Sequence, residues 1–224
     1  MHYKDELLKL FSFTPPKWDE IRKLLDEHKL TKLELADIAN EIVDDCSYEY
    51  QWALNPDDKS VTLDTMHTPF LIDSLKLLVE YGFDPNVNNS TYDDTAMFGL
   101  IYVDMPNVGA SALRYLLENG ANPNFGDNFV KTDNLFNYLT ASIAFDKYDF
   151  AYKVQCWLVL MAYGASYTDG TIPLDMLNGN KIEIFKNFER FDYKIEHYPE
   201  NSGYGKWTMH IFNKVTGEEV ARYH

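Results

Sequence analysis

The sequence has few cysteines and no long apolar run. Its two cysteines, Cys46 and Cys156, form no Cys-x-x-Cys pair; a bridge between them has no support, and we expect buried free thiols in a reducing compartment. No apolar run approaches the roughly 20 residues that a membrane helix needs. Acids interrupt residues 1–6, so no signal peptide is expected there, and the sequon at residues 89–91 is interpreted as chance. We therefore expect a cytoplasmic protein without a membrane segment.

Basic residues are scarce beside acidic ones. The 224 residues include 20 Lys and Arg against 35 Asp and Glu, a net charge of −15. Such a surface repels phosphate backbones, which disfavours nucleic acid as a partner. It suits a basic partner, or it simply keeps the protein soluble. Because 46% of the residues are hydrophobic, with 16 Tyr, 14 Phe and 4 Trp, we expect a real core rather than disorder.

Motifs for catalysis or metal binding are missing. No serine lies in a Gly-x-Ser-x-Gly elbow, and residues 201–205 lack the context of a nucleotide-binding loop. Adjacent acids such as Asp93 and Asp94 point in different directions and form no acid–base pair by themselves. Metal-ligand spacing is absent among the histidines, which are His2, His28, His67, His197, His210 and His224. We expect neither an enzyme nor a cofactor.

What the sequence does contain is a recurring phrase. Residues 78–86 read Leu-Val-Glu-Tyr-Gly-Phe-Asp-Pro-Asn, and residues 116–124 read Leu-Leu-Glu-Asn-Gly-Ala-Asn-Pro-Asn. A weaker copy occupies residues 160–166. Apolar residues at helical spacing precede each glycine, which takes the left-handed position at a helix end. The proline that follows in the first two copies cannot continue the helix. The three glycines are Gly82, Gly120 and Gly164.

Apolar spacing and turn residues predict the remaining elements. Helices are expected at residues 17–28, 33–43, 94–103, 108–119, 132–145, 148–163 and 181–188, and before Gly82. From Phe191 onward the apolar residues alternate between turn signals, which predicts a two- or three-stranded antiparallel meander. We expect an N-terminal helical cap at residues 1–60. It could contain a degenerate copy of the repeat, in which His28 stands at the position of the turn glycine. Repeats then follow at residues 61–190, and the meander at residues 191–224 packs on the last one.

The helix-turn-helix-loop unit resembles the ankyrin repeat. Residues 80–86 and 118–124 carry the resemblance at the turns, residues 171–177 resemble the family's Thr-Pro-Leu helix opening with one insertion, and residues 179–185 its second-helix opening. The resemblance covers roughly residues 61–188. It implies a mostly α fold, an ankyrin-like helical-repeat solenoid with a small C-terminal antiparallel β meander, and a protein-binding role. The family period is about 33 residues, whereas the glycines here are 38 and 44 apart, so longer inter-helix loops are expected.

In such an array the loops after the glycine turns line up along one edge, beside the short helices of the concave face. Here these loops mix aromatic residues with acids and amides. Aromatic side chains serve as interface anchors and acids steer a basic partner; alternatively, the aromatic residues fold inward and hold the loops. The predicted partner-binding residues are Tyr92, Asp93, Asp94, Phe125, Asp127, Phe129 and Tyr167.

Two functions from different classes remain open. The first is a non-enzymatic protein–protein interaction module that binds a partner through its inter-repeat loops and concave face. A more specific version of this hypothesis is an inhibitor or immunity-type protein that covers a basic toxin. The second is a small-ligand, metal-binding or enzymatic pocket between the array and the meander, with His197, His210 and Tyr204 as its polar groups. A monomer is expected, although exposed edge strands offer a route to a dimer.

Overall fold

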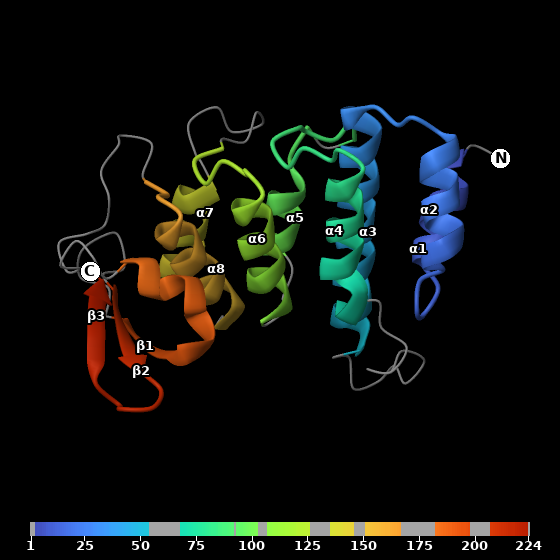
Figure 1. Ribbon diagram of the computed structural model, residues 1–224. Coiled ribbons are helices and arrows are strands. Elements are labelled where there is room, and N and C mark those ends of the chain that lie inside the picture. Colours follow the sequence, from blue (N-terminus) through green and yellow to red (C-terminus); the bar gives the residue numbers. More distant parts are fainter. Residues whose placement is uncertain are drawn as a thin grey trace. The chain divides into compact units, whose positions relative to one another are not determined.

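The computed structural model describes residues 3–53, 68–91, 93–102, 107–125, 135–145, 151–166, 182–197 and 207–223. These residues are mainly helical, with a small antiparallel sheet formed by the last part of the chain (Figure 1). The chain divides into two compact units, Met1–Asn122 and Pro123–His224, and the division falls inside the segment predicted to hold the repeats. The mostly helical fold with a C-terminal meander is thereby confirmed.

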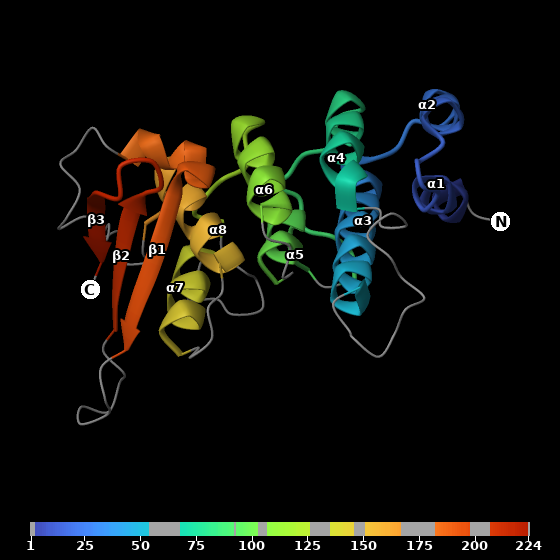
Figure 2. The same cartoon turned by 90° about the horizontal axis from the view of Figure 1, so that it is seen from below.

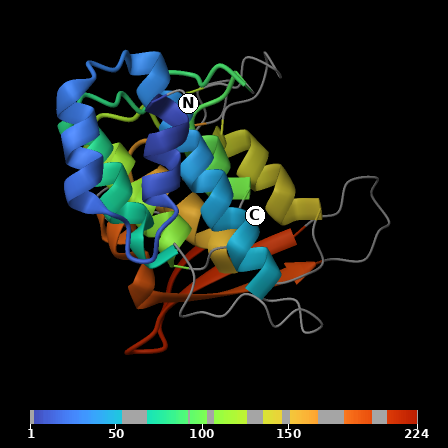
Figure 3. The same ribbon diagram turned by 90° about the vertical axis from the view of Figure 1, so that its right-hand side faces the viewer.

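The first unit is built from helices. Its elements are α1 (Tyr3–Phe11), α2 (Trp18–Glu27), α3 (Lys32–Ala53), the 3-10 turn η2 (Thr68–Phe70), α4 (Leu71–Glu80), α5 (Ala96–Tyr102) and α6 (Val108–Glu118). Contacts join α3 to α4 and α5, and α6 to α4 and α5 (Figure 2). At the N-terminal end, α1 contacts both α2 and α3 (Figure 3).

The apolar spacing seen in the sequence forms the core of this unit. Leu75 and Leu78 of α4, and Leu113 and Leu116 of α6, are fully buried. Residues three apart on a helix share one face, so each pair points toward the neighbouring helices. Burying one leucine side chain contributes about 2 kcal/mol.

Three helix ends share the same capping geometry. At the end of α4, the N–H of Gly82 donates to the Val79 carbonyl at 3.0 Å, and that of Phe83 to the Leu78 carbonyl at 2.9 Å. This pair of bonds is the Schellman motif, which requires a left-handed residue that glycine adopts at little cost. The ends of α6 and α8 repeat both bonds. The glycines and their φ angles are Gly82 at 95°, Gly120 at 92° and Gly164 at 89°. The predicted glycine helix ends are confirmed.

The asparagine after Pro85 connects the first turn to the second. Asn86 Nδ2 donates to the Gly120 carbonyl at 2.9 Å, while its Oδ1 accepts from the Asn122 N–H at 2.7 Å. A primary amide offers a donor and an acceptor together, which matches a backbone carbonyl and N–H. The side chain of Asn86 therefore fixes the turn of α6 relative to the turn of α4.

The second unit contains an equivalent connection. Asn124 Nδ2 donates to the Gly164 carbonyl at 3.1 Å, and its Oδ1 accepts from the Ser166 N–H at 2.8 Å. The two asparagines stand at the same place in the recurring phrase. The final Asn of the phrase thus has a structural role that its repetition did not explain.

Replacing Asn86 with alanine removes both bonds to the next turn. We expect a loss of about 1 kcal/mol of unfolding free energy, because a hydrogen bond contributes about that much and water can solvate these exposed groups. Urea denaturation followed by circular dichroism measures it. Asn119→Ala is the matched control, since the Asn119 side chain bonds only locally to the Tyr115 carbonyl in the same helix. Equal losses in the two variants would contradict the connecting role of Asn86.

The second unit joins two helices, a 3-10 segment and a sheet. Its elements are α7 (Leu135–Phe145), α8 (Ala151–Ala162), η3 (Ile182–Arg190), β1 (Phe191–His197), β2 (Trp207–Asn213) and β3 (Glu219–Tyr223). The helix α8 contacts α7 and η3. The strand order is β1-β2-β3 with antiparallel pairing, and a register shift interrupts the second pair between Ile211 and Phe212. The ring of Phe191 meets Phe185 of η3 edge to face at 5.4 Å.

Some elements differ from the sequence predictions. The helix α1 was not predicted, although Leu7, Leu10 and Phe11 bury one face of it. The helix α3 continues to Ala53, ten residues beyond the predicted end at residue 43. The predicted helix at residues 181–188 is a 3-10 segment, interrupted by non-helical dihedral angles at Asn187. His28 does not reproduce the glycine turns, because its backbone is extended with φ −119°.

Candidate functional site

The loop after the first glycine turn, residues 87–94, is fastened to α3. The N–H of Ser90 donates to Asp37 Oδ1 at 2.6 Å, and its hydroxyl donates to Asp37 Oδ2 at 2.8 Å. The loop also closes on itself, since the N–H of Asn89 donates to the Asp94 carbonyl at 2.7 Å. A loop held in this way presents its exposed side chains from a defined backbone.

Two asparagines shape the end of this loop. Asn88 Nδ2 donates to the backbone carbonyl of Asp93 at 2.9 Å and to its Oδ1 at 3.0 Å. Asp93 has φ 55°, a left-handed conformation that aspartate tolerates better than most residues. Asn89 is buried, and its Nδ2 donates to the carbonyl and carboxylate of Asp94. The sequon asparagine is thus engaged inside the protein, in keeping with the interpretation of the sequon as chance.

A cluster of four carboxylates forms where α3 meets the start of α5. We define the acidic cluster as Glu41, Asp44, Asp45 and Asp94. Burial raises the pKa of Asp44 from its ordinary 3.8 to about 6, and the negative charge of Asp94 is the second cause. The charges of Glu41 and Asp45 act in the same direction. Repulsion among like charges is therefore part of this site.

A glycine explains how close Asp44 comes to α5. A Cβ added at Gly99 would lie 2.8 Å from Val43 Cγ1 and 3.7 Å from Asp44 Oδ1. With no side chain at Gly99, α3 and α5 approach until the Asp44 carboxylate lies against the α5 backbone. This approach partly buries a charge beside Asp94.

No cation compensates this charge within the part of the chain that the structure describes. Asn40 Nδ2 donates to Asp44 Oδ2 at 3.3 Å, a neutral partner, and none of the causes of the Asp44 pKa shift is a positive charge. Asp37 differs, because Lys4 Nζ lies 3.5 Å from its Oδ2. Lys4 therefore partly neutralises the negative charge of Asp37, whereas no described cation does so for Asp44.

The charge imbalance belongs mainly to the first unit. Met1–Asn122 holds 22 of the 35 acidic residues and 10 of the 20 basic ones, whereas Pro123–His224 holds 13 and 10. The net charges are −12 and −3. The field that would steer a basic partner therefore originates in the unit that carries the acidic cluster.

The structure locates three of the seven predicted partner-binding residues. Asp93 is exposed and Asp94 is half-buried, both in the loop beside α3. Phe125 is half-buried in the second unit, and its carbonyl accepts from the Leu135 N–H at 3.4 Å. The other four lie outside the described residues; they are Tyr92, Asp127, Phe129 and Tyr167.

Sequence analysis missed the acids that α3 contributes. Glu41, Asp44 and Asp45 stand at spacings of three and four, which places them along neighbouring positions of one helix surface. That spacing was a usable signal. The sequence could not indicate that these acids lie close to Asp94, because that closeness depends on the packing of α3 against α5.

Of the groups considered for chemistry, Tyr204 lies outside the described residues, and the others are placed as follows. Both cysteines are buried and free, as predicted, and burial raises the pKa of the Cys156 thiol to about 12, so it stays protonated. The strand register pairs His210 with Lys194 and His197 with Trp207, three positions apart along the sheet. No group of three or more His, Cys, Asp or Glu among the described residues could hold a metal ion.

The first unit also has an apolar crevice between α1, α3 and α4. Its walls include Leu8 and Phe11 of α1, Ile42 and Cys46 of α3, and Phe70 just before α4. Apart from Asp45, its polar lining consists of serine residues, one of which, Ser74, donates its hydroxyl to the Phe70 carbonyl at 2.9 Å. Such a lining supplies no nucleophile with a neighbouring base.

Comparisons with models of known families, with curated proteins and with solved structures find no match to this chain. Within the ranges that the structure describes, no helix is both long enough and apolar enough to cross a membrane.

Proposed function

We propose that the protein is a non-enzymatic interaction module that binds a basic partner protein through an acidic surface of its first unit. That surface consists of the acidic cluster together with the exposed Asp93. The single observation that carries the proposal is Asp44, a partly buried carboxylate whose charged neighbours, among the described residues, are other carboxylates. Such an arrangement costs folding free energy, and a cationic side chain from a partner would relieve that cost.

The proposed scaffold is an ankyrin-like array. The recurring helix ends support it, as do the equivalent connections made by Asn86 and Asn124. In such an array the loop at residues 87–94 is an inter-repeat loop, the region through which a partner is expected to bind. An inhibitor or immunity-type protein that covers a basic toxin is one form of this function.

The first unit suits recognition more than catalysis. Its candidate loop is fixed to α3 by Ser90 and Asp37, so binding would order little additional backbone. Several carboxylates of α3 and the adjoining loop act in the same direction on Asp44. Attraction of a basic surface needs only their charge, and it would be strongest at low ionic strength.

Removing three exposed charges from the surface tests the proposal. We expect the triple variant Glu41→Gln, Asp45→Asn, Asp93→Asn to bind a fluorescent lysine-rich peptide about fivefold more weakly at low salt, since three exposed ion pairs contribute about 1 kcal/mol together. Fluorescence anisotropy measures the affinity. Added salt should reduce the difference between the wild type and the variant.

The control changes the same number of charges elsewhere in the unit. Asp19→Asn, Glu20→Gln, Glu27→Gln alters exposed residues of α2, a helix whose helix contacts in the described chain are mainly with α1. The control should retain nearly all the affinity if the surface is specific. Equal weakening in both triple variants would show that only net charge acts, and would contradict the proposed surface.

A further inference from the structure

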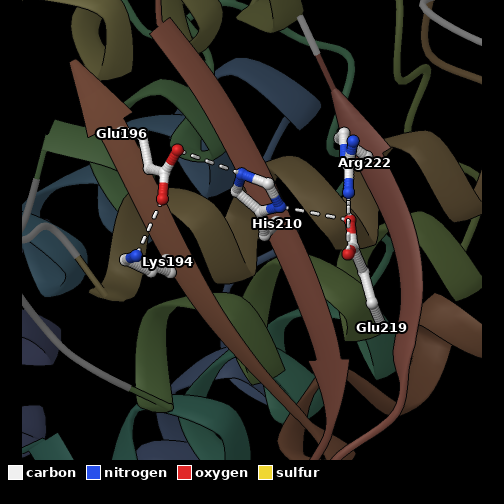
Figure 4. A network of polar contacts seen from close by, with 5 residues as sticks. All are labelled: Lys194, Glu196, His210, Glu219 and Arg222. Carbon is white, nitrogen blue, oxygen red and sulfur yellow. Dashed lines mark hydrogen bonds and ion pairs between the residues drawn. The ribbon is translucent and has the colours of Figure 1, made fainter. Parts of the chain in front are cut away.

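The C-terminal sheet carries a line of alternating charges on one side of its three strands (Figure 4). The middle member is His210 on β2, and a glutamate stands on either side of it. Positive side chains flank both glutamates. The members are Lys194 and Glu196 from β1, His210 from β2, and Glu219 and Arg222 from β3.

The strand register places these residues across from one another. Lys194 and Arg222 are the pairing partners of His210 on the two neighbouring strands. His210 Nδ1 lies 3.1 Å from Glu219 Oε1, and His210 Nε2 lies 3.7 Å from Glu196 Oε2. The imidazole side chain is only 15% exposed, so water screens these charges less than at an open surface.

Both glutamates are held in the ionised form. Arg222 donates to both carboxylate oxygens of Glu219, at 2.8 and 3.0 Å, and this bond is the main cause that lowers the Glu219 pKa to about 2. Lys194 Nζ lies 2.7 Å from Glu196 Oε1 and is the main cause that lowers the Glu196 pKa. The charge of His210 acts in the same direction on each carboxyl.

The protonation state of the imidazole decides how many strands it connects. A neutral imidazole has one N–H, so it donates to one glutamate and turns a lone pair toward the other. An imidazolium ion donates from both nitrogens. His210 Nε2 is buried without a hydrogen-bond partner at its present 3.7 Å from Glu196, which is the position where a second donor would be satisfied.

We propose that His210 is a proton-dependent clasp whose side chain links all three strands when it is protonated and links only β2 and β3 when it is neutral. Charged groups face it from both neighbours, Lys194 and Glu196 on β1 and Glu219 and Arg222 on β3. Within β2 its ring stacks on Phe212 at 6.3 Å. Each cation is bonded to its own glutamate, so the nearest charges to the two ring nitrogens are negative.

The pH dependence follows from these charges. The clasp is complete where His210 is protonated and both glutamates are ionised. Its contribution to stability is present while His210 is protonated and is lost when His210 becomes neutral. It falls again in strong acid, where the lowered pKa values of Glu196 and Glu219 are finally passed.

The test compares the wild type with His210→Gln by thermal unfolding near pH 5.5 and near pH 8. We expect the variant to melt about 3 °C lower near pH 5.5 and the difference to fall to about zero near pH 8. Acid-dependent changes elsewhere in the chain are common to both proteins and cancel. The control is His28→Gln, because His28 stacks on Tyr3 at 5.0 Å and belongs to the first unit, not to the sheet; the melting difference between this control and the wild type should be the same at both pH values.

A second variant keeps the histidine and removes the negative charge of its acceptor on β1. The melting temperature of Glu196→Gln should therefore depend less on pH than that of the wild type, while the His210–Glu219 contact is retained.

In the wild type, NMR should show the amides of β1 exchanging faster near pH 8 than near pH 5.5 after correction for intrinsic rates, with those of α4 unchanged. Melting differences that are the same at both pH values, or β1 protection independent of pH, would overturn the proposal.

Discussion

Replacing Trp157 with alanine is expected to lower the unfolding free energy of the second unit by about 3–5 kcal/mol, the usual cost of deleting a buried tryptophan. Trp157 of α8 is 1% exposed and stacks on Phe136 of α7 at 5.5 Å. Its Nε1–H donates to Thr140 Oγ1 at 3.0 Å. The substitution therefore opens a cavity between two helices and removes the buried bond at the same time.

Two further variants separate these contributions. Trp157→Phe keeps an aromatic ring against Phe136 but loses the donor, so we expect it to cost about 1–2 kcal/mol. Trp18→Ala is the control, since Trp18 of α2 is only half-buried and meets Phe11 edge to face at 6.4 Å. Urea denaturation followed by circular dichroism compares all three. A loss below about 1 kcal/mol for Trp157→Ala would mean that α7 and α8 do not pack through this residue.

Sequence analysis succeeded where structure depends on a few neighbouring residues. Gly82, Gly120 and Gly164 were correctly placed, because a left-handed helix end is a local requirement that glycine meets best. The helices α2, α5 and α6 follow apolar spacing in the same way. The strands of the tail follow from alternation, which resolves into the predicted meander.

It failed where structure depends on distant residues. The length of α3 was underestimated, because the residues after Val43 were not recognised as continuing the apolar spacing of the helix. The partners of Asn86 are 34 and 36 residues away, so the repeated asparagine predicted a turn and not a connection. His210 was considered with His197, but the strand register sets it beside Glu196 and Glu219 instead.

The candidate site was only partly predictable for the same reason. Asp93 and Asp94 were identified from their loop, which follows a recognisable glycine turn. Asp44 belongs to a different helix and joins them because Gly99 permits α3 and α5 to approach. The sequence gives no sign of this approach, yet it produces the only large pKa shift among the described carboxyls of the first unit.

Replacing Asp44 with asparagine is expected to stabilise the protein at neutral pH. The pKa of Asp44 is raised in the folded state from 3.8 to about 6, so folding is opposed once this carboxyl is ionised. A shift of this size corresponds to about 3 kcal/mol, and solvent screening of a partly exposed group reduces the expected gain to about 1–2 kcal/mol. Asparagine keeps the shape of the side chain and an oxygen that accepts from Asn40.

The sign of the effect depends on pH. The stability of the wild type should fall as pH rises from about 4 through about 6, because the folded state holds the Asp44 proton more tightly than the unfolded state does. The Asp44→Asn variant lacks this titration, so the two proteins should be equally stable near pH 4 and differ by the full amount above pH 7. Urea denaturation across this range measures both curves. Glu41→Gln, an exposed member of the cluster, is the control and should change stability less.

The same substitution links stability to the proposed function. A lysine or arginine from a partner would lower the pKa of Asp44 and recover the free energy that its ionisation costs, so the wild type should bind the lysine-rich peptide more weakly as pH falls below about 6. Asp44→Asn should bind it weakly at every pH while unfolding at higher urea near neutrality. A variant that is less stable near pH 7.5 would show that folding needs the ionised carboxylate. Asp44 would then be a structural residue rather than a charge held in place for a partner.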